Sequence, residues 1–457
     1  MLPINPEIFK AYDIRGVYGQ DFDNELARLL GLAYVEFMKI QPEYDSSRKL
    51  KIVVASDMRL SSPELKEVLI KGLLEAGADV IDLGIASTPT MYFGVGHYGY
   101  DGGIMVSASH NPKEWNGFKL VRAKGIPISG ETGIYYLRDK VLENRFKPAS
   151  IPGEAITNGQ TLDEEIAYAF SLVDASQIKP LKVVADAANG MGATYIKALF
   201  DKLPCELISL NLELDGSFPA HEADPLKEEN LVQIKNEVKT RGADFGIATD
   251  GDGDRIFFID NAGETIDPSI VRGLLAKMFL EIKPGAKIGY DARPGRITVD
   301  LIQEGGGLPV MTRVGHSLIK EQMNKENIFF AGESSGHFYF QGAAGSFEYP
   351  SVIILKLLAF VSQTPSGIAA YVKPYKKYFH SGEINRVVSD KGAVFDRVAA
   401  KYADGKLSKL DGYTIEYPDF WFNVRGSNTE PKIRLNLEAI DQATMAKKRD
   451  EILALMV

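Results

Sequence analysis

The sequence has little of several features that would define a protein class at once. Its 457 residues include one cysteine, Cys205, so no disulfide can form within the chain, and we expect a reducing, cytoplasmic environment. The longest apolar run, residues 352–361, is interrupted by Lys356. It has about half of the roughly 20 residues that a membrane-spanning helix needs. Residues 1–6 lack the basic and apolar regions of a signal peptide. We therefore expect no membrane partner.

An excess of positive charge is also missing. The chain has 52 lysines and arginines against 61 aspartates and glutamates, and its formal net charge is -9. Such a balance argues against a general nucleic-acid or membrane-surface binder, so we expect no nucleic-acid partner. An anionic ligand would need local cations, which makes lysines and arginines in glycine-rich loops candidates for binding it.

The order of predicted strands and helices repeats along the chain. Strand, helix and strand in succession indicate a parallel crossover unit. The predicted strands fall at residues 51–55, 78–82, 102–107, 181–186, 206–210, 244–248, 287–291, 308–312 and 328–331. After residue 374 the pattern changes to mixed strands and helices. We predict an α/β protein with three consecutive mixed α/β domains of similar plan, followed by a smaller α+β C-terminal domain. The predicted domains are residues 1–152, 153–260, 261–370 and 371–457.

One serine lies where a reactive group is expected. Ser109 follows the small, apolar strand at residues 102–107, stands between Ala108 and His110, and precedes an Asn-Pro turn. Such a turn at a strand end holds a side chain on a rigid base. In an open α/β sheet, ligands bind at the carboxyl ends of the strands. Ser109 is therefore a candidate nucleophile, although a lone Ser-His pair could also be a polar strand-to-loop transition.

Three aspartates alternate with glycines directly after another predicted strand. Asp250, Asp252 and Asp254 offer hard oxygen donors, which suit Mg²⁺ or Ca²⁺, and the glycines let the backbone curl. A calcium EF-hand is excluded because its sixth and twelfth positions would be Arg255 and Asn261 in place of glycine and glutamate. A solvated acidic turn is the alternative. Three carboxylates after a buried strand repel one another unless a charge such as a divalent cation neutralises them.

Residues 332–337 form a glycine-flanked loop after a predicted strand. The loop offers the carboxylate of Glu333, the hydroxyl of Ser335 and the imidazole of His337. This combination is suited to binding the hydroxyl groups of a sugar. Taken alone, the pattern is weak, because a glycine-rich turn with a satisfied histidine has the same composition.

A loop in the last predicted domain combines groups that bind phosphate. It offers one guanidinium, two hydroxyls, one amide and backbone N–H groups in a short stretch. The residues concerned are Arg425, Ser427, Asn428 and Thr429. A polar hairpin turn is the alternative interpretation of this loop in isolation.

In this order and at this spacing, the four loops resemble those of the α-D-phosphohexomutase superfamily. The likeness is closest to its bacterial phosphomannomutase/phosphoglucomutase branch and covers the whole chain. The resemblance implies four domains arranged around a central cleft. It also implies a mutase that interconverts hexose 1-phosphates and 6-phosphates of mannose or glucose. The implied reaction passes through a phosphoserine and a hexose 1,6-bisphosphate, with Mg²⁺ as cofactor and sugar phosphates as ligands. The protein would be a monomer or a weak homo-oligomer.

The resemblance assigns roles residue by residue. Ser109 would carry the phosphoryl group. Mg²⁺ would be bound by Ser109, Asp250, Asp252 and Asp254. Arg255 would offset charge on the transferred group, and the candidate bases are His110, Lys119 and His337, with neighbouring cations expected to lower the pKa of Lys119. The substrate-binding residues would be Lys10, Tyr12, Arg15, Glu333, Ser335, His337, Arg425, Ser427, Asn428 and Thr429.

Some details of the sequence bear on the substrate. The Ser-Asn-Thr of the phosphate loop is similar to the mannose and glucose enzymes, whereas phosphoglucosamine mutases usually carry Ser-Gly-Thr. Lys10 stands where an arginine is common, and residues 345–350 lack the expected Asp-rich turn. A smaller echo of the family appears at residues 218–225. Phosphoglucosamine mutase, a Mg²⁺-dependent sugar phosphatase and an inert sugar-phosphate binding protein remain the alternatives.

Overall fold

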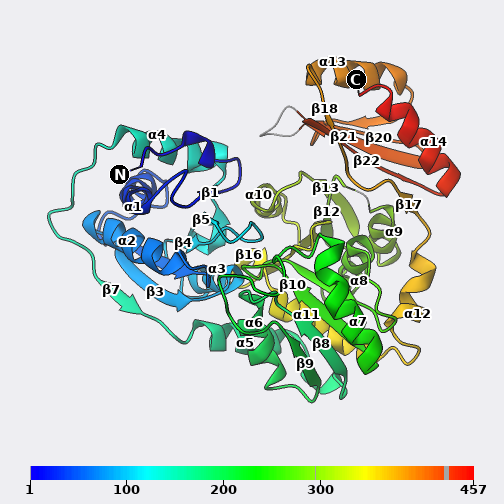
Figure 1. The fold of residues 1–457 in the computed structure, drawn as a ribbon, viewed down its shortest axis with the longest axis horizontal. Coiled ribbons are helices and arrows are strands. Elements are labelled where there is room, and N and C mark those ends of the chain that lie inside the picture. Colours follow the sequence, from blue (N-terminus) through cyan, green and yellow to red (C-terminus); the bar gives the residue numbers. More distant parts are fainter. Residues whose placement is uncertain (1, 294, 427–431, 457) are drawn as a thin grey trace. The chain divides into compact units, whose positions relative to one another are not determined.

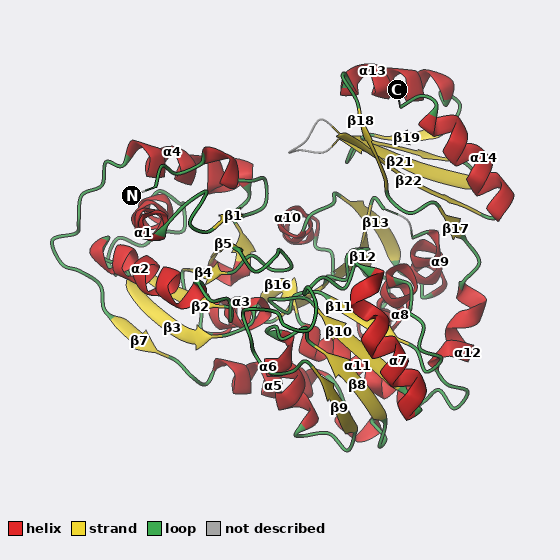
Figure 2. Ribbon diagram, in the orientation of Figure 1, coloured by secondary structure: helices red, strands yellow, loops and turns green. Residues whose placement is uncertain are grey.

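The computed structural model describes residues 2–293, 295–426 and 432–456. The chain forms two compact units, the first made of residues 1–265 and 337–369 and the second of residues 266–336 and 370–457. Each unit combines helices with strands, as Figures 1 and 2 show. Among the described residues, none of the helices is both long enough and apolar enough to cross a bilayer.

The N-terminal sheet of the first unit has the strand order β1-β5-β4-β2-β3-β7, with β6 beside β5. Strands β4, β2, β3 and β7 are parallel, whereas β5 is antiparallel to β4 and β1. The strands are β1 (Ile14–Val17), β2 (Lys51–Ser56), β3 (Asp79–Ile85), β4 (Gly102–Val106), β5 (Trp115–Arg122), β6 (Ile126–Pro127) and β7 (Ala155–Thr157). The chain leaves β2 toward β3 and leaves β4 toward β5, so these two neighbours form a topological switch point.

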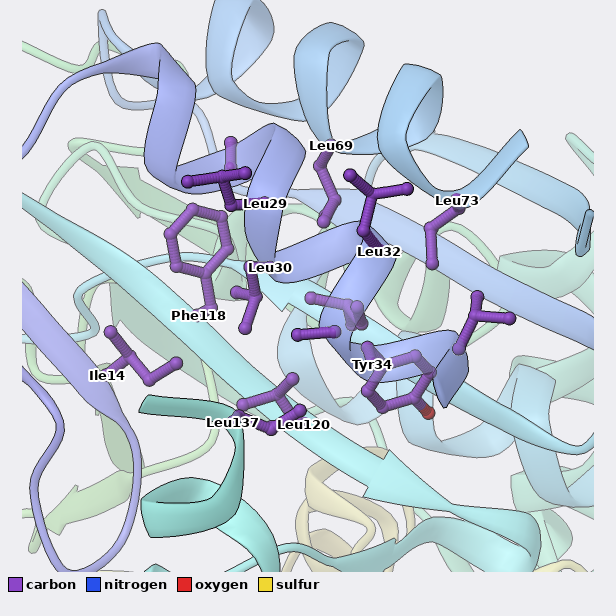
Figure 3. Close-up of a cluster of buried hydrophobic side chains, with 14 of the residues drawn as sticks. Ile14, Leu29, Leu30, Leu32, Tyr34, Leu69, Leu73, Phe118, Leu120 and Leu137 are labelled. Atoms are coloured by element: carbon purple, nitrogen blue, oxygen red, sulfur yellow. The ribbon is translucent and has the colours of Figure 1, made fainter. Parts of the chain in front are cut away.

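Different helices cover the two faces of this sheet. They are α1 (Asn24–Lys39), α2 (Ser62–Glu75), α3 (Thr88–His97) and α4 (Tyr135–Glu143). Figure 3 shows Leu30 of α1, Leu69 of α2 and Phe118 of β5 converging in one buried apolar cluster. On the other face, Gly103 makes room for α3, because a Cβ there would lie 2.7 Å from a methyl group of Val95. Strand β4 is buried along its whole length. It is therefore a rigid base for the residues that follow it.

The second sheet of the first unit repeats this plan. Its order is β11-β10-β8-β9, with β9, β8 and β10 parallel and β11 antiparallel to β10. The strands are β8 (Lys182–Asp186), β9 (Glu206–Leu210), β10 (Phe245–Thr249) and β11 (Ile256–Ile259), and the helices are α5 (Thr161–Leu172), α6 (Gly192–Phe200) and α7 (Val232–Arg241). The first and third parallel strands, β8 and β10, are again neighbours whose following loops leave in opposite directions.

A later segment of the chain completes the first unit. It consists of the antiparallel hairpin β15 (Phe338–Gly342) and β16 (Gly345–Glu348), followed by α11 (Pro350–Ser362). Glu165 of α5 joins this segment to α3, because its carboxylate accepts hydrogen bonds from Thr90 at 2.6 Å and Ser351 at 3.0 Å. Burial raises the pKa of Glu165 to about 7, against the lowering effect of these two hydroxyls.

The raised pKa of Glu165 predicts a specific pH dependence of stability. The unfolded carboxyl group ionises near pH 4.5 and the folded one near pH 7, so stability is lost as pH rises between these values. At 1.36 kcal/mol for each pKa unit, the wild type should lose about 3 kcal/mol between pH 5 and pH 8 through this group. The Glu165→Gln variant should lack this loss, as urea unfolding at both pH values would show.

An exposed carboxylate on the same helix supplies the control for this prediction. Asp163 is in the first turn of α5 and is exposed. Asp163→Asn should keep the wild-type pH dependence. An unchanged slope in Glu165→Gln would mean that the buried carboxyl group does not titrate in this range.

The second unit contains a third sheet of the same plan. Strands β13, β12 and β14 lie side by side in this order and are parallel. They are β12 (Lys287–Asp291), β13 (Leu308–Thr312) and β14 (Phe330–Gly332), with helices α8 (Pro268–Ile282), α9 (Arg296–Glu304) and α10 (His316–Glu326). As in the other sheets, the first and third parallel strands are adjacent, so β12 and β14 form the switch point.

The C-terminal part of the second unit is built differently. An antiparallel sheet has the order β17-β22-β21-β20-β19, with β18 also paired to β22. The elements are α12 (Ile368–Val372), which precedes the sheet, β17 (Phe379–His380), β18 (Ile384–Val387), α13 (Lys391–Lys401), β19 (Lys406–Ser408), β20 (Tyr413–Glu416), β21 (Phe420–Gly426), β22 (Lys432–Ala439) and α14 (Gln442–Leu453). The predicted fold class, three α/β domains of one plan and a smaller α+β domain, is confirmed. The exact domain boundaries stay predictions.

Candidate active site

Ser109 lies at the switch point of the first sheet. It follows β4, and the neighbouring parallel strand β2 is followed by Asp57 and Arg59. The fully buried guanidinium of Arg59 donates hydrogen bonds to the carbonyl oxygens of Ser109 at 2.7 Å and Asn111 at 2.6 Å. The Ser109 loop is therefore fixed to the strand beside its own, at the edge of the sheet where ligands of such folds bind.

The local geometry presents the Ser109 hydroxyl to the aspartate loop. The backbone of Ser109 has a φ of 53°, which is uncommon for a residue with a side chain, and its N–H donates to Ser107 Oγ at 2.9 Å. Ser109 Oγ donates to Asp250 Oδ2 at 2.9 Å and lies 3.2 Å from His110 Nδ1. The candidate nucleophile thus contacts both a carboxylate and an imidazole.

The aspartate loop is the tip of a β-hairpin. Thr249 of β10 pairs with Ile256 of β11, so the residues between them turn back on themselves. Asp250 Oδ1 stabilises this turn by accepting from the N–H groups of Gly253 and Arg255, each at 3.1 Å. The tip brings together carboxylate oxygens within 4.8 Å of one another, from Asp250, Asp252 and Asp254.

Lys119 supplies a positive charge to this cluster. It lies on β5, is buried, and forms ion pairs with Asp252 and Asp254. Burial opposes its charge, but the two carboxylates raise the pKa of Lys119 well above its ordinary value. The expectation that neighbouring cations lower this pKa is therefore wrong for this arrangement. The sequence does not reveal that the nearest charges to Lys119 are carboxylates from a second sheet.

The three carboxylates of the loop are not equivalent. Burial, and then repulsion from Asp252 and Asp254, raises the pKa of Asp250 to about 8. Burial also opposes the ionisation of Asp254, but Lys119 and His337 outweigh it and hold the pKa of Asp254 well below its usual range. A further cation would therefore stabilise the ionised form of Asp250 most. The charges that already surround Asp250 do not compensate that form.

Two histidines contact the reacting groups. Burial, together with the charges of Arg255 and Arg15, holds the pKa of His110 well below its ordinary value, so this imidazole is neutral at pH 7. His337 precedes β15, and its Nε2 lies 3.1 Å from Asp254 Oδ1. The structure therefore places both predicted histidines at the aspartate cluster.

Arg255 directs a guanidinium group toward the same cluster. Its Nε lies 3.9 Å from Asp250 Oδ2. Both Nε and Nη1 of Arg255 are buried without a hydrogen-bond partner among the described residues. Buried donors of this kind are costly unless a ligand satisfies them, so Arg255 is available to bind an anion.

The N-terminal residues with predicted binding roles lie against the Ser109 loop. Arg15 Nη1 donates to the carbonyl oxygen of Ala108 at 3.2 Å and to Asn111 Oδ1 at 2.9 Å. Lys10 lies over the ring of Trp115, with its Nζ 5.3 Å from the ring centre. Tyr12, between them in sequence, is half-buried. In this arrangement, Arg15 supports the loop as well as carrying a charge.

The aspartate cluster fits a divalent cation. Asp252 is fully buried, and its Oδ1 has no hydrogen-bond partner among the described residues. Its other oxygen, Oδ2, accepts from Thr88 Oγ1 at 2.5 Å and from Lys119. A buried carboxylate oxygen without a partner is expensive, and carboxylate oxygens are the ligands that Mg²⁺ and Ca²⁺ prefer. The donor set therefore suits a hard cation.

The second unit contains Glu333 and Ser335 of the predicted sugar loop. They follow β14, at the switch point of the third sheet. Glu333 Oε1 accepts from Arg293 Nη2 at 3.2 Å and from the N–H of Gly315 at 3.1 Å, and Ser335 Oγ lies 3.4 Å from the same arginine nitrogen. Arg293 also pairs with Asp291 at 2.5 Å. Arg293, which lies outside the loop of residues 332–337, is thus the cation that contacts both Glu333 and Ser335.

Arg425 lies at the end of β21, also in the second unit. Its Nη2 donates to Glu383 Oε2 at 2.9 Å, and Arg434 pairs with the other oxygen of Glu383 at 3.3 Å. Burial opposes the charge of Glu383, but the two arginines lower its pKa. The described residues do not include the rest of the predicted phosphate loop, Ser427, Asn428 and Thr429.

The sequence patterns do not single out several residues at these sites. Thr88 holds Asp252 twice, through its hydroxyl group and through an N–H to carbonyl bond of 3.1 Å. The local pattern at Thr88 is the Ser-Thr-Pro start of a helix. This pattern predicts a helix cap, but it does not identify Asp252 as the residue that Thr88 contacts. Arg59 and Arg293 each follow the first parallel strand of a sheet. Glu348 of β16 is buried within 4.8 Å of Asp254 and His337. No local sequence pattern identifies Glu348 as a residue of the site.

Comparison with protein families gives a consistent result along the chain. Models of the phosphoglucomutase/phosphomannomutase family match in succession. Alpha/beta/alpha domain I matches residues 6–145, domain II residues 164–263, domain III residues 267–378, and the C-terminal domain residues 383–455.

Individual relatives are similar over almost their whole length. A phosphomannomutase of Vibrio cholerae is 37% identical over 98% of both chains, and a protein of Xanthomonas campestris named phosphohexose mutases is 39% identical over 97% of both. The crystal structure of a phosphoglucomutase/phosphomannomutase family protein from Burkholderia thailandensis is 33% identical. It superposes with a TM-score of 0.89, covering 99% of this chain and 97% of that one. The chain therefore belongs to the phosphoglucomutase/phosphomannomutase family, and it is a hexose phosphate mutase.

Proposed function

We propose that this mutase interconverts the 1-phosphate and 6-phosphate of mannose or glucose. Ser109 would carry the phosphoryl group between turnovers, and a hexose 1,6-bisphosphate would be the intermediate. The observation that carries this proposal is the contact of 2.9 Å between the Ser109 hydroxyl and Asp250. It combines a nucleophile with a carboxylate cluster suited to a divalent cation, the two elements that phosphoryl transfer needs.

Asp250, Asp252 and Asp254 are the proposed ligands of Mg²⁺, together with Ser109 when it carries phosphate. The metal would neutralise negative charge on the transferred group. Its fit rests on the unpartnered oxygen of Asp252 and on the raised pKa of Asp250. A hexose phosphate mutase binds sugar phosphates, so this class of ligand follows from the activity. The identity of the metal ion is part of the proposal.

The protein's own cations would share the charge of the phosphoryl group. Arg255 has buried N–H groups that an anion would satisfy. Lys119 remains protonated between two carboxylates, so we assign it an electrostatic role. Both side chains are held by the protein before substrate arrives, and preorganised charges of this kind contribute most to transition-state stabilisation.

His110 is the proposed general base for the Ser109 hydroxyl. Its Nδ1 lies 3.2 Å from Ser109 Oγ, and its lowered pKa keeps the imidazole neutral and able to accept a proton. His337 would serve the sugar hydroxyl, since it is the other imidazole at the cluster. Lys119 is the weaker candidate, because its proton is stabilised by two ion pairs.

The remaining predicted residues would bind the sugar phosphate. Glu333 and Ser335 would bind sugar hydroxyls, and Lys10, Tyr12 and Arg15 would bind near the serine loop. The phosphate that does not react would be bound by Arg425, Ser427, Asn428 and Thr429. A cytoplasmic location and a monomeric or weakly homo-oligomeric state stay predictions from the sequence.

The proposed activity can be tested by ³¹P NMR of the purified protein with Mg²⁺ and a trace of hexose 1,6-bisphosphate. Separate tubes would contain mannose 1-phosphate, glucose 1-phosphate and glucosamine 1-phosphate. A growing 6-phosphate resonance with mannose or glucose is the expected result, and the relative rates rank the sugars.

The other outcomes would replace the proposal. Conversion confined to glucosamine 1-phosphate would identify a phosphoglucosamine mutase. Growth of inorganic phosphate would indicate a sugar phosphatase, since water would then take the phosphoryl group. A protein that binds the sugars without any change in the spectra would be an inert binder.

A further inference from the structure

The loop of residues 215–225 has no part in the chemistry described above. It follows β9 in the second sheet and includes Phe218 and His221. It nevertheless packs against the first sheet as well. A Cβ on Gly216 would lie 2.4 Å from the carbonyl oxygen of Met58 and 2.7 Å from the Cα of Arg59. Backbone approach of this kind excludes any residue larger than glycine at position 216.

His221 fixes this loop to its own sheet. Its Nε2 lies 3.1 Å from Oδ2 of Asp186, the last residue of β8, and its Nδ1 lies 2.9 Å from the carbonyl oxygen of Glu222. Both ring nitrogens thus face acceptors, an arrangement that suits the doubly protonated imidazolium. The hydrogen bond that His221 donates to Asp186 raises the pKa of His221, against the effect of burial. The loop is therefore held by a charged pair.

Phe218 extends from the fixed loop toward the first sheet. Its backbone has a φ of 51°, a strained conformation for a bulky residue. The conformation places its ring 5.0 Å from the guanidinium carbon of Arg59, with the cation over the ring face. A structure keeps such backbone strain only where the surrounding contacts hold the residue in place. The loop therefore holds the Phe218 ring against Arg59.

Arg59 holds the backbone that carries Ser109. Its side chain is fully buried and pairs with Asp57 at 3.1 Å. Its two terminal nitrogens donate to four carbonyl oxygens, those of Ser109, Asn111, Pro112 and Trp115, at distances of 2.6–3.1 Å. The guanidinium is therefore the centre around which the Ser109 loop is folded, and the Phe218 ring covers one of its faces.

We propose that Phe218 and His221 are positioning residues for the phosphoryl-transfer reaction, and that they act on Ser109 through Arg59. The ion pair between His221 and Asp186 fixes the loop. The loop in turn holds the Phe218 ring against the guanidinium of Arg59, and the guanidinium positions the backbone of Ser109 through its hydrogen bonds. This inference rests on the proposed role of Ser109. A small displacement of a reacting group can lower a rate up to about 100-fold.

Variants of Phe218 test this proposal. Phe218→Leu keeps an apolar side chain but removes the aromatic face, and kcat should fall about 10-fold. The KM for hexose phosphate should stay unchanged, since the ring acts on the buried guanidinium of Arg59. The rate at which hexose 1,6-bisphosphate phosphorylates Ser109, measured by rapid quench, should fall with kcat. Phe218→Tyr restores the ring and should restore both rates.

Three comparisons separate positioning from general stability. Phe218→Gly relieves the strained φ, so its unfolding midpoint should be no lower than that of Phe218→Leu, yet it should lose the same activity. Phe329→Leu removes a ring of the same kind, 4.9 Å from Lys283 in the second unit, and should leave kcat unchanged. His221→Ala combined with Phe218→Leu should cost little more than either change alone, because both act on one loop.

The outcomes are distinguishable from those of the proposed function. If the wild type takes no phosphate on Ser109, the proposed reaction fails. If the wild type is phosphorylated and Phe218→Leu matches its rate, the positioning role is overturned while the reaction stands. The role is also overturned if activity across the variants follows the unfolding midpoint, or if Phe218→Tyr is as slow as Phe218→Leu.

Discussion

Replacing Ser109 by alanine is expected to abolish the interconversion of hexose phosphates, with a loss of at least about 10⁴-fold in kcat. The hydroxyl is the proposed carrier of the phosphoryl group, so its removal takes away the group that would accept the phosphoryl group and return it to the sugar. ³¹P NMR of the variant with Mg²⁺ and hexose 1,6-bisphosphate would measure the loss. Mass spectrometry should find one phosphoryl group on the wild type and none on the variant.

The left-handed backbone of Ser109 offers a second variant that separates chemistry from folding. Ser109→Gly also removes the hydroxyl, but glycine adopts a φ of 53° without strain, so this variant should be at least as stable as Ser109→Ala. Both should be inactive. Ser171→Ala, an exposed serine of α5, is the matched control and should keep full activity. Wild-type turnover by Ser109→Gly would contradict a phosphoserine mechanism.

The regular elements with clear hydrophobic patterns are predictable from the sequence. Strands at residues 287–291 and 308–312 lie within the predicted limits, and the parallel crossover units follow from the strand and helix order. The order of strands within each sheet is not predictable in this way. It depends on which strand lies beside which, and this order makes the first and third parallel strands neighbours and creates the switch points.

The sequence pattern does not predict two strands that shape the active site. Strand β5 contains Trp115, Asn116 and Lys119, and its mixed composition resembles a loop more than a buried strand. Strand β11 directly follows the aspartate loop and closes it into a hairpin. Both are antiparallel additions to parallel sheets. Whether these two segments form strands depends on the neighbouring strand with which each of them pairs. A local sequence pattern does not identify that neighbour.

The candidate site shows the same division. The serine and aspartate loops carry several chemically specific residues within a few positions, so their roles can be inferred locally. Arg59 and Thr88 are single residues whose targets, Ser109 and Asp252, lie 50 and 164 positions away. Their importance comes from tertiary contacts. The sequence predicts the pKa shift of Lys119 with the wrong sign for this reason, because the fold brings the opposing charges to it.

Replacing Asp252 by asparagine is expected to lower kcat/KM about 10³-fold, the second largest effect. One carboxylate of the proposed Mg²⁺ site is lost, and metal ions contribute several kcal/mol of charge stabilisation in phosphoryl transfer, with 1.36 kcal/mol corresponding to each tenfold change. Treatment of the wild type with EDTA should remove activity, and added Mg²⁺ should restore it. The unfolding temperature of the wild type should rise with Mg²⁺ and that of the variant should not.

An exposed carboxylate from the same hairpin region provides the matched control. Glu264 pairs with Lys239 on the surface, and Glu264→Gln should keep both the activity and the response to Mg²⁺. If Asp252→Asn kept the wild-type response to Mg²⁺, the cation would bind elsewhere. The unpartnered oxygen of Asp252 would then need another explanation. If EDTA had no effect on the wild type, Lys119 and Arg255 would have to neutralise the phosphoryl group without a metal ion, although Lys119 is already paired with two of the buried carboxylates.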